Sequence, residues 1–381
     1  MTGPGRVAQN QATEAASGTE PVSRAVARRR ITRWVAVLIL ITAGLALLLF
    51  SPLIGPVSIP PTVVASIVAH ESTGSLVPGS PCGSYPASAH QCAIWVEIVW
   101  QARMPAILLA LAAGAALGLS GGSLQGVFRN PLADPYLLGL SSGAAMGAAL
   151  IFVFHIDLAS AYLALPVFAF LGGLLPGLVV YLAAGRARAV ETLVLTGVAL
   201  ASLFSALLAT FILINPLGEL QVSFWLLGGM TGATWARSGI VLGAVLIAGG
   251  IVAVRGRQLN VLQLGPDVAQ SLGVDGRRVA RQLVLTTTLL TATAVAFTGV
   301  IGFVGLVSPH IIRRMVGPDY RTLLPLSAGM GAVFLMAAWD ISQVVIPSVV
   351  LPVGIPTAFV GAPFFVYLLY RRRSPTGGPS V

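Results

Sequence analysis

The sequence predicts an all-α protein that crosses a membrane about ten times. Of its 381 residues, 56% are hydrophobic and 9% are charged, a balance that excludes ordinary soluble domains. Apolar runs of about 18 residues or more recur, each long enough to span a hydrocarbon core of about 30 Å. All 22 basic residues are arginine, and they gather in the short connections between these runs. Such clustering is typical of the cytoplasmic loops of membrane proteins.

The first apolar run covers residues 34–54 and follows a polar segment that ends in SRAVARRRITR. This arrangement is similar to a secretory signal, but the run exceeds the roughly 7–15 residues of a signal core and no small-residue cleavage site follows. We therefore expect a disordered cytoplasmic tail over residues 1–33. A transmembrane domain over residues 34–373 and a second cytoplasmic tail over residues 374–381 complete the predicted organisation.

The long loop over residues 55–100 is expected outside the cell, because it holds no arginine. A short amphipathic helix is predicted after Pro60 and Pro61. Cys82 and Cys92 lie in the same loop. An oxidising compartment would allow them to form a disulfide, but two cysteines alone favour a disulfide and two free thiols about equally.

Five further spans are predicted before the main polar stretch of the chain. The second and third are separated by FRNPLADP, a proline-broken turn with Arg129, and the fourth and fifth by GRARAVE. Residues 215–235 are mixed in character and fit a half-helix at the outer interface. The five spans cover residues 104–128, 136–155, 159–184, 192–213 and 237–254.

The apolar run over residues 282–312 is bounded by Arg281 and Arg313. A single helix would place arginine on both sides of the membrane. We therefore predict a hairpin of two short helices that turns near Gly299 or Gly302, because short spans are tolerated where they line a cavity. The ninth and tenth spans are predicted over residues 323–346 and 351–370.

Ten spans place both termini in the cytoplasm. All arginines except Arg103 and Arg237 then fall on the cytoplasmic side, as the positive-inside rule requires. The net charge of +10 is thereby explained by topology. No basic patch interleaved with aromatic residues is present, so we expect no nucleic-acid partner.

The longest internal polar stretch covers residues 255–281. Within it, Gly265, Pro266 and Asp267 predict the start of a short helix, and Gly273 its end. Val268 and Leu272 fall on one face of that helix. A two-turn helix is marginal alone and needs a partner. The residues leave open whether this partner is the chain's own bundle or a separate cytoplasmic subunit.

Motifs for catalysis and metal binding are missing from the sequence. A P-loop requires a lysine, and the chain has none. The metal-site motifs HExxH and CxxC do not occur, and the four histidines are scattered along the sequence. We therefore expect no catalytic residue, no metal site and no cofactor. The sequence GLSGG at residues 118–122 lies inside a hydrophobic run, where small residues favour close helix packing over a nucleophile elbow.

Asp340 is the one clear charge inside a predicted span. Intramembrane charges often mark function, so one alternative is a secondary transporter that couples to protons through Asp340. The other interpretation is a carboxylate that is hydrogen-bonded within the bundle. A membrane scaffold without transport activity is a further alternative of a different class.

Four long motifs in fixed order resemble the FecCD family, the permeases of ABC importers for iron-siderophores, haem and cobalamin. The resemblance covers about residues 34–373. The motifs are SGGSLQGVFRNPLADPYLLGLSSGAAMGAAL (120–150), LQLGPDVAQSLGV (262–274), GVIGFVGLVSPHIIRRMVGPDYRTLLP (299–325) and LPVGIPTAFVGAPFFVYLL (351–369).

This resemblance implies a ten-span subunit with an inverted repeat in the bacterial plasma (inner) membrane. Its expected partners are membrane lipid, a second permease copy or close paralogue, two cytoplasmic ABC ATPase subunits and an extracytoplasmic substrate-binding protein. The ATPase subunits would hydrolyse ATP, so the chain itself would not be an enzyme.

The resemblance also assigns candidate site residues. The 262–274 motif matches the loop that lies in the ATPase groove, with candidate coupling residues Leu264, Gly265, Ala269, Leu272 and Gly273. The fifth and tenth spans are expected to line the translocation path, with candidates Thr196, Ser202, Ser205 and Thr210.

Candidate docking points for the binding protein are Arg103 and Arg237, and the sequence departs here from the family. Where members often read Arg-x-Pro-Arg, this chain has Arg103-Met104-Pro105-Ala106. Of the charged positions near the end of the ninth span, it keeps Asp340. We therefore expect the binding protein to dock through fewer pairs of arginine and carboxylate than is usual in the family.

Overall fold

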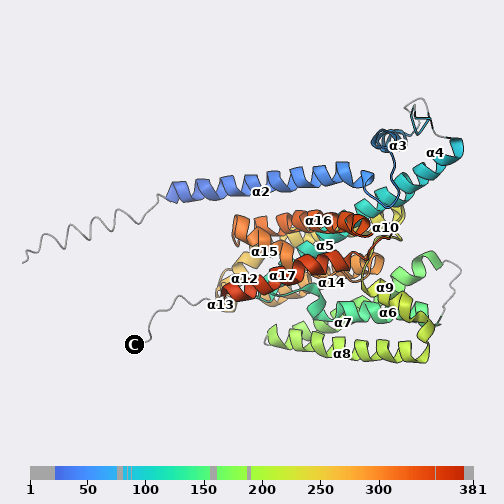
Figure 1. The fold of residues 1–381 in the computed structure, drawn as a ribbon. Coiled ribbons are helices and arrows are strands. Elements are labelled where there is room, and N and C mark those ends of the chain that lie inside the picture. Colours follow the sequence, from blue (N-terminus) through green and yellow to red (C-terminus); the bar gives the residue numbers. More distant parts are fainter. Residues whose placement is uncertain are drawn as a thin grey trace, which may run out of the picture.

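The computed structural model describes residues 22–74, 80–83, 85–86, 88–154, 161–186, 190–347 and 349–372. Within these ranges the elements are helical, apart from one isolated bridge between Ile346 and Val349. Most of the long helices lie side by side in one bundle (Figure 1). The all-helical class predicted from the sequence is confirmed.

Seven segments of the described chain are long and apolar enough to cross a membrane. The predicted third, eighth and tenth spans correspond to the shorter helices α6, α15 and α17. The exact number of crossings and the inverted repeat stay predictions. The principal helices are α2 Val22–Phe50, α5 Met104–Val127, α6 Leu140–Phe154, α7 Ala161–Arg186, α8 Val190–Ile214, α10 Trp235–Ala244, α11 Gly250–Val254, α14 Gly276–Thr298, α15 Val304–Val316, α16 Tyr320–Val344 and α17 Gly354–Arg372.

Short helical elements connect these principal helices. They are η1 Ser51–Leu53, α3 Pro61–Thr73, α4 Ala89–Val96, η2 Glu97–Arg103, η3 Pro135–Leu138, η4 Pro216–Gly218, α9 Glu219–Leu226, η5 Val245–Gly249, α12 Gly256–Gln263 and α13 Pro266–Ser271. The predicted helix after Pro60 and Pro61 is present as α3, and the predicted half-helix within 215–235 as α9.

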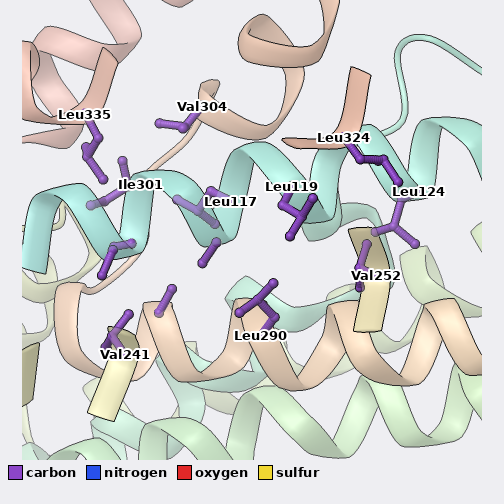
Figure 2. Packing of buried hydrophobic residues seen from close by; sticks show 14 of the residues in the cluster. Leu117, Leu119, Leu124, Val241, Val252, Leu290, Ile301, Val304, Leu324 and Leu335 are labelled. Carbon is purple, nitrogen blue, oxygen red and sulfur yellow. The ribbon is translucent and has the colours of Figure 1, made fainter. Parts of the chain in front are cut away.

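Helix α5 forms the centre of the bundle, and nearly all of its residues are buried. It packs against α14, α15, α16 and α10. Gly114 lies against the backbone of Gly331, and Gly121 against that of Gly305, so close that a β-carbon would not fit at either position. Figure 2 shows α5 running between side chains of α16 on one side and of α14 on the other.

Helix α5 continues without a break from α4 and η2, so one helix runs from Ala89 to Val127. The sequence analysis assigned residues up to 100 to a loop. The helix starts earlier because the Ser88 hydroxyl accepts a hydrogen bond from the Gln91 N–H, and neither glycine nor proline interrupts residues 89–104.

The bundle has two ends that differ in character (Figure 1). One, here called the cap end, carries α3, α4 and α9. The other, here called the basic end, carries α12, α13, the start of α2 and the end of α17. Arg313 and Arg314 in the last turn of α15 and Arg321 in the first turn of α16 also belong to the basic end.

A small hydrophobic cluster and a disulfide between Cys82 and Cys92 hold the cap together. Of the two alternatives left open by the sequence, the structure therefore shows the disulfide. The cluster buries α3 residues such as Val63 and Ile67 against Trp95. Because α3 packs on η1 and η2, the cap rests mainly on the segments that connect it to the bundle.

Helices α2 and α14 also begin earlier than the sequence predicted. Helix α2 starts at Val22 rather than near residue 34, because the alanine- and arginine-rich segment before the span favours helix. Residues 1–21 of the predicted tail, and the predicted tail 374–381, lie outside the described residues. Helix α14 starts at Gly276, where the Asp275 side chain accepts a hydrogen bond from the Arg278 N–H.

The hairpin predicted within residues 282–312 is present with its break at Gly299, which has a φ of +69°. Helix α14 ends at Thr298 and α15 begins at Val304. The two helices differ in length, with 23 and 13 residues, so only the second is short. The Tyr136 hydroxyl donates to the Ile301 carbonyl at 3.0 Å and accepts from the Ile301 N–H at 3.2 Å, which fixes the connection between them.

Candidate coupling and transport sites

The predicted coupling residues lie in helix α13 and in the residues that flank it, Leu264 and Gly265 before it and Leu272 and Gly273 after it. Gly265 has φ +112° and ψ 158°, a conformation that is essentially restricted to glycine. Pro266 then begins the helix, with Asp267 in its first turn. Gly273, with φ +75°, follows the last turn in the left-handed conformation that commonly ends a helix. The predicted start and end of this helix are confirmed.

Helix α13 has an exposed apolar side and a buried side. Leu264, Val268 and Leu272 are 61%, 43% and 59% exposed. Ala269 is fully buried on the opposite side, where its carbonyl accepts the Val274 N–H at 2.9 Å. Of the five candidate coupling residues, Leu264 and Leu272 thus face outward, Ala269 faces the bundle, and the two glycines bound the helix.

Helix α12 precedes the coupling helix and was not predicted from the sequence. Its buried residues are Gly256, Leu259 and Leu262. Leu259 and Leu262 have the three-residue spacing of one helix face, and this was the available signal. It was easy to overlook because the rest of GRQLNVLQ is polar.

Side-chain amides of α12 bind the ends of two long helices. Asn260 donates to Asp319 at 2.7 Å and accepts the Tyr320 N–H at 2.9 Å, at the start of α16. Gln263 donates to the Gly126 carbonyl in the last turn of α5 at 2.9 Å. These contacts connect the coupling segment to the core of the bundle.

Asp319 lies at the basic end, outside the predicted spans, and its side chain caps α16. Partial burial on its own would raise the pKa of this carboxyl. Hydrogen bonds from the Asn260 side chain and the Arg321 N–H, together with the charges of Arg33 and Arg321, lower the pKa below its usual value. The ion pair to Arg33 is 3.2 Å long and also joins α2 to this end of the bundle.

The predicted path residues lie on α8, at one edge of the bundle (Figure 1). Ser202, Ser205 and Thr210 are exposed, and Thr196 is half-buried. The hydroxyls of Thr196, Ser202 and Thr210 donate to carbonyls four residues earlier, at 2.7, 3.0 and 2.8 Å. Back-bonding of this kind makes a helix surface less polar than its sequence indicates. Exposed Leu195, Val198, Leu203 and Leu207 share this helix.

The two candidate docking arginines lie at the same end of the bundle. Arg103 ends η2 and Arg237 lies in the first turn of α10, which are joined by contact between Trp100 and Trp235 with ring centroids 4.8 Å apart. Both arginines lie at the cap end, and their predicted location on the outer side of the membrane stays a prediction.

Arg103 is buried and bound within the chain. Its guanidinium donates to the Pro52 carbonyl at 2.8 Å and to the Val57 carbonyl, and it lies directly over Gly55. In this conformation Arg103 holds the segment after α2 against the start of α5. Arg237 donates to the Gly232 carbonyl at 2.7 Å and is half-buried. A docking role for either residue stays a prediction, and for Arg103 it would require the guanidinium to leave these carbonyls.

Asp340 lies in the last turns of α16 and is buried. Both of its carboxylate oxygens lie 2.6 Å from the hydroxyl of Ser51, which immediately follows α2. Among the described residues, no group of three or more metal-binding side chains is present. The hydrogen bonds between Ser51 and Asp340 favour the hydrogen-bonded interpretation over a proton carrier.

Comparison with known proteins gives consistent matches over most of the chain. Residues 38–371 match the FecCD transport family. The chain is 42% identical over 279 residues to the cobalamin import system permease protein of Halobacterium salinarum, covering 72% of this chain and 74% of that protein. It is 38% identical over 289 residues to the hemin transport system permease protein of Yersinia pestis, covering 75% and 85%.

A solved structure has the same arrangement of helices. It describes an inward-facing conformation of a protein assigned to the metal-chelate type of ABC transporter. The superposition has a TM-score of 0.67 at 30% sequence identity, and it covers 81% of this chain and 97% of the other.

Proposed function

The chain belongs to the FecCD transport family, and on that premise we propose that it is the permease subunit of an ATP-driven importer for an iron-siderophore, haem or cobalamin-like metal chelate. It is a multi-pass protein of the plasma (inner) membrane. In this proposal two separate ABC ATPase subunits hydrolyse ATP, and the permease chain supplies the path across the membrane.

Helix α13 is the observation that carries this proposal. This helix and its flanking residues expose Leu264, Val268 and Leu272 at the basic end, and these apolar side chains have no covering partner in the single chain. Apolar anchors at helical spacing are what a groove on a partner protein accepts. An ATPase subunit bound here would move α13 as it binds and hydrolyses ATP.

The exposed faces of α8 and α17 support a second permease copy. Phe359 and Tyr370 of α17 are 77% and 74% exposed, and the window of α8 that could span a membrane is 11% buried. In a pair of copies these helices would face a shared path, lined by apolar groups and by the back-bonded hydroxyls of α8. A path of this kind suits a large chelate that is held by many weak contacts.

The cap end is the proposed docking side for an extracytoplasmic binding protein. It combines the disulfide-linked cap with Arg237. Because Arg103 is bound to carbonyls of its own chain, this proposal gives the cap surface and Arg237 more weight than the sequence did.

Transport in proteoliposomes tests the proposed function. The permease is reconstituted with its ATPase and binding protein, and uptake of hemin, cobalamin and a ferric siderophore is measured separately. We expect one class of chelate to accumulate only with ATP and to be unaffected by a protonophore. Uptake that is abolished by the protonophore and indifferent to ATP would establish proton coupling instead.

A further inference from the structure

We propose that Asn260 is a positioning residue that transmits movement of the coupling helix α13 to α16. This inference rests on the proposed function, because it needs an ATPase that acts on α13. It concerns the α12 node, defined as Asn260, Gln263, Asp319 and Tyr320. The node lies one helix away from the surface proposed to bind the ATPase.

Helix α13 reaches the bundle through its neighbours in sequence. It packs against α12 and against the start of α14. On the α12 side, Leu262 is buried and lies so close to Gly276 that an added β-carbon there would be 2.9 Å from the leucine side chain. This contact joins α12 to the first turn of α14, the two elements against which α13 packs.

Helix α12 lies against α16 with no space between the two backbones. A β-carbon on Gly256 would lie 2.8 Å from the Tyr320 carbonyl oxygen and 2.9 Å from Arg321. Such a close approach transmits displacement, because packed elements cannot be compressed further. Tyr320 itself is 1% exposed, so the contact occurs inside the structure rather than on its surface.

The Asn260 amide uses both of its polar atoms in this contact. Its nitrogen donates to Asp319, and its oxygen accepts the N–H of Tyr320, one of the groups at a helix start that has no partner within the helix. Asp319 also accepts the Arg321 N–H at 3.1 Å. The amide orientation follows from this chemistry, since reversing it would place an oxygen against the carboxylate.

The node extends from α16 to two other helices. Gln263 donates to Gly126 at the end of α5, and a β-carbon on Gly126 would meet the side chains of Leu259 and Tyr320 at 2.9 Å. The Tyr320 hydroxyl accepts from Arg313 of α15 at 3.4 Å, and Arg313 also donates to Gln125 of α5 at 3.1 Å. Helices α5, α15 and α16 are thus joined to α12 at one point.

A coupling role makes a different prediction from a purely structural one. Packed side chains and hydrogen-bond networks can carry coupling between distant sites, and changes within such a network alter the strength of the coupling. If Asn260 only stabilised the fold, its loss would reduce ATPase binding, ATP hydrolysis and transport together. If it transmits movement, ATP hydrolysis continues while transport per ATP falls.

The test compares four variants with wild type in proteoliposomes that contain the ATPase and binding protein. Asn260→Ala removes both hydrogen bonds, and Asn260→Asp places two carboxylates together. The double change Asn260→Asp with Asp319→Asn restores one donor and one acceptor across the same contact. Gln258→Ala is the matched control, because its amide lies on α12 but accepts a hydrogen bond from Arg255 in the same segment.

The measured quantities are chelate transported per ATP hydrolysed and the amount of ATPase that co-purifies. For Asn260→Ala and Asn260→Asp we expect transport per ATP to fall by about 5-fold or more, the lower end of typical coupling between sites. Co-purification should remain at the wild-type level. The double variant should recover most of the loss, and Gln258→Ala should behave as wild type.

Hydrogen exchange gives a readout that does not depend on activity. In wild type, addition of ATP should change exchange both in α12–α13 and in the first turn of α16, whereas in Asn260→Ala the change should stop at α12. Unchanged transport per ATP in Asn260→Ala would overturn the inference, as would loss of the bound ATPase from that variant. Failure of wild-type uptake with ATP would instead reject the proposed function itself.

Discussion

At the scale of single residues, several polar side chains have partners that the sequence does not reveal. Arg103 binds backbone carbonyls of the segment after α2. Asp340 binds Ser51, which is distant in sequence. Charged residues near or within predicted spans often mark partners or proton transfer, and these were the roles that the sequence indicated. The structure shows that both residues secure the turn between the first helix and the cap.

Asp319 provides a prediction of pH dependence at this scale. Its folded-state pKa is depressed, so it contributes stability that is present above its unfolded pKa of about 3.9 and lost as the pH falls through the lower folded value. Asp319→Asn keeps a capping side chain but removes the charge. We expect this variant to unfold at a lower temperature than wild type at pH 7, with the difference disappearing below about pH 4.

Thermal unfolding of the detergent-solubilised protein at several pH values measures this difference. Asp275→Asn is a suitable comparison, because Asp275 caps α14 in the same way. A stability difference between Asp319→Asn and wild type that stays constant down to pH 3 would exclude the ionised carboxylate as its cause.

At the scale of elements, the sequence predicted α13 well and α12 not at all. Gly265, Pro266 and Gly273 are conformational signals that act locally, so they can be read from the chain. Helix α12 depends instead on tertiary contacts of Gly256, Asn260 and Gln263 with other helices. No local pattern identifies which helices will meet it. The continuation of α5 into α4 is a different case, because the Ser88 cap and the absence of glycine and proline over residues 89–104 are local signals that the predicted span boundary did not use.

Leu272→Asp tests the exposed face of α13. Leu272 is 59% exposed, so a carboxylate there should leave the permease folded. In a partner groove the same carboxylate would be desolvated, which costs far more than leaving it in water. We expect the amount of co-purified ATPase to fall by about 10-fold or more, as the loss of an apolar anchor worth about 2 kcal/mol predicts.

Leu220→Asp is the control for the added charge, because Leu220 of α9 is 72% exposed at the opposite end of the bundle. That variant should retain the ATPase. Equal co-purification of the ATPase by Leu272→Asp and wild type would contradict the proposed role of α13.

At the scale of the whole molecule, composition and arginine placement were sufficient for the membrane class. They could not determine which helix faces lipid and which faces a second copy, because both faces are apolar. Helices α2 and α8 illustrate the problem, since their spanning windows are 17% and 11% buried in the single chain. The proposed function separates the two helices, because α8 is proposed to line the path and α2 is not.

A bulky substitution on each helix makes this distinction measurable. Ser202 of α8 and Thr42 of α2 are both exposed, and each hydroxyl donates to the carbonyl four residues earlier. We expect Ser202→Trp to reduce the initial rate of chelate uptake severalfold by filling the path, and Thr42→Trp to leave it unchanged. Equal rates in the two variants would mean that α8 does not line the path.

The unbroken helix from Ala89 to Val127 has a mechanical consequence. Its 39 residues form a rod of about 58 Å, with the disulfide-linked cap at one end and Gly126, the acceptor of Gln263, near the other. A tilt of about 5° around the cap would displace the far end by about 5 Å, roughly one helical turn. If the binding protein docks on the cap and the ATPase on α13, as proposed, this rod would connect the two partners, and a load applied at one face of the membrane would be felt at the other.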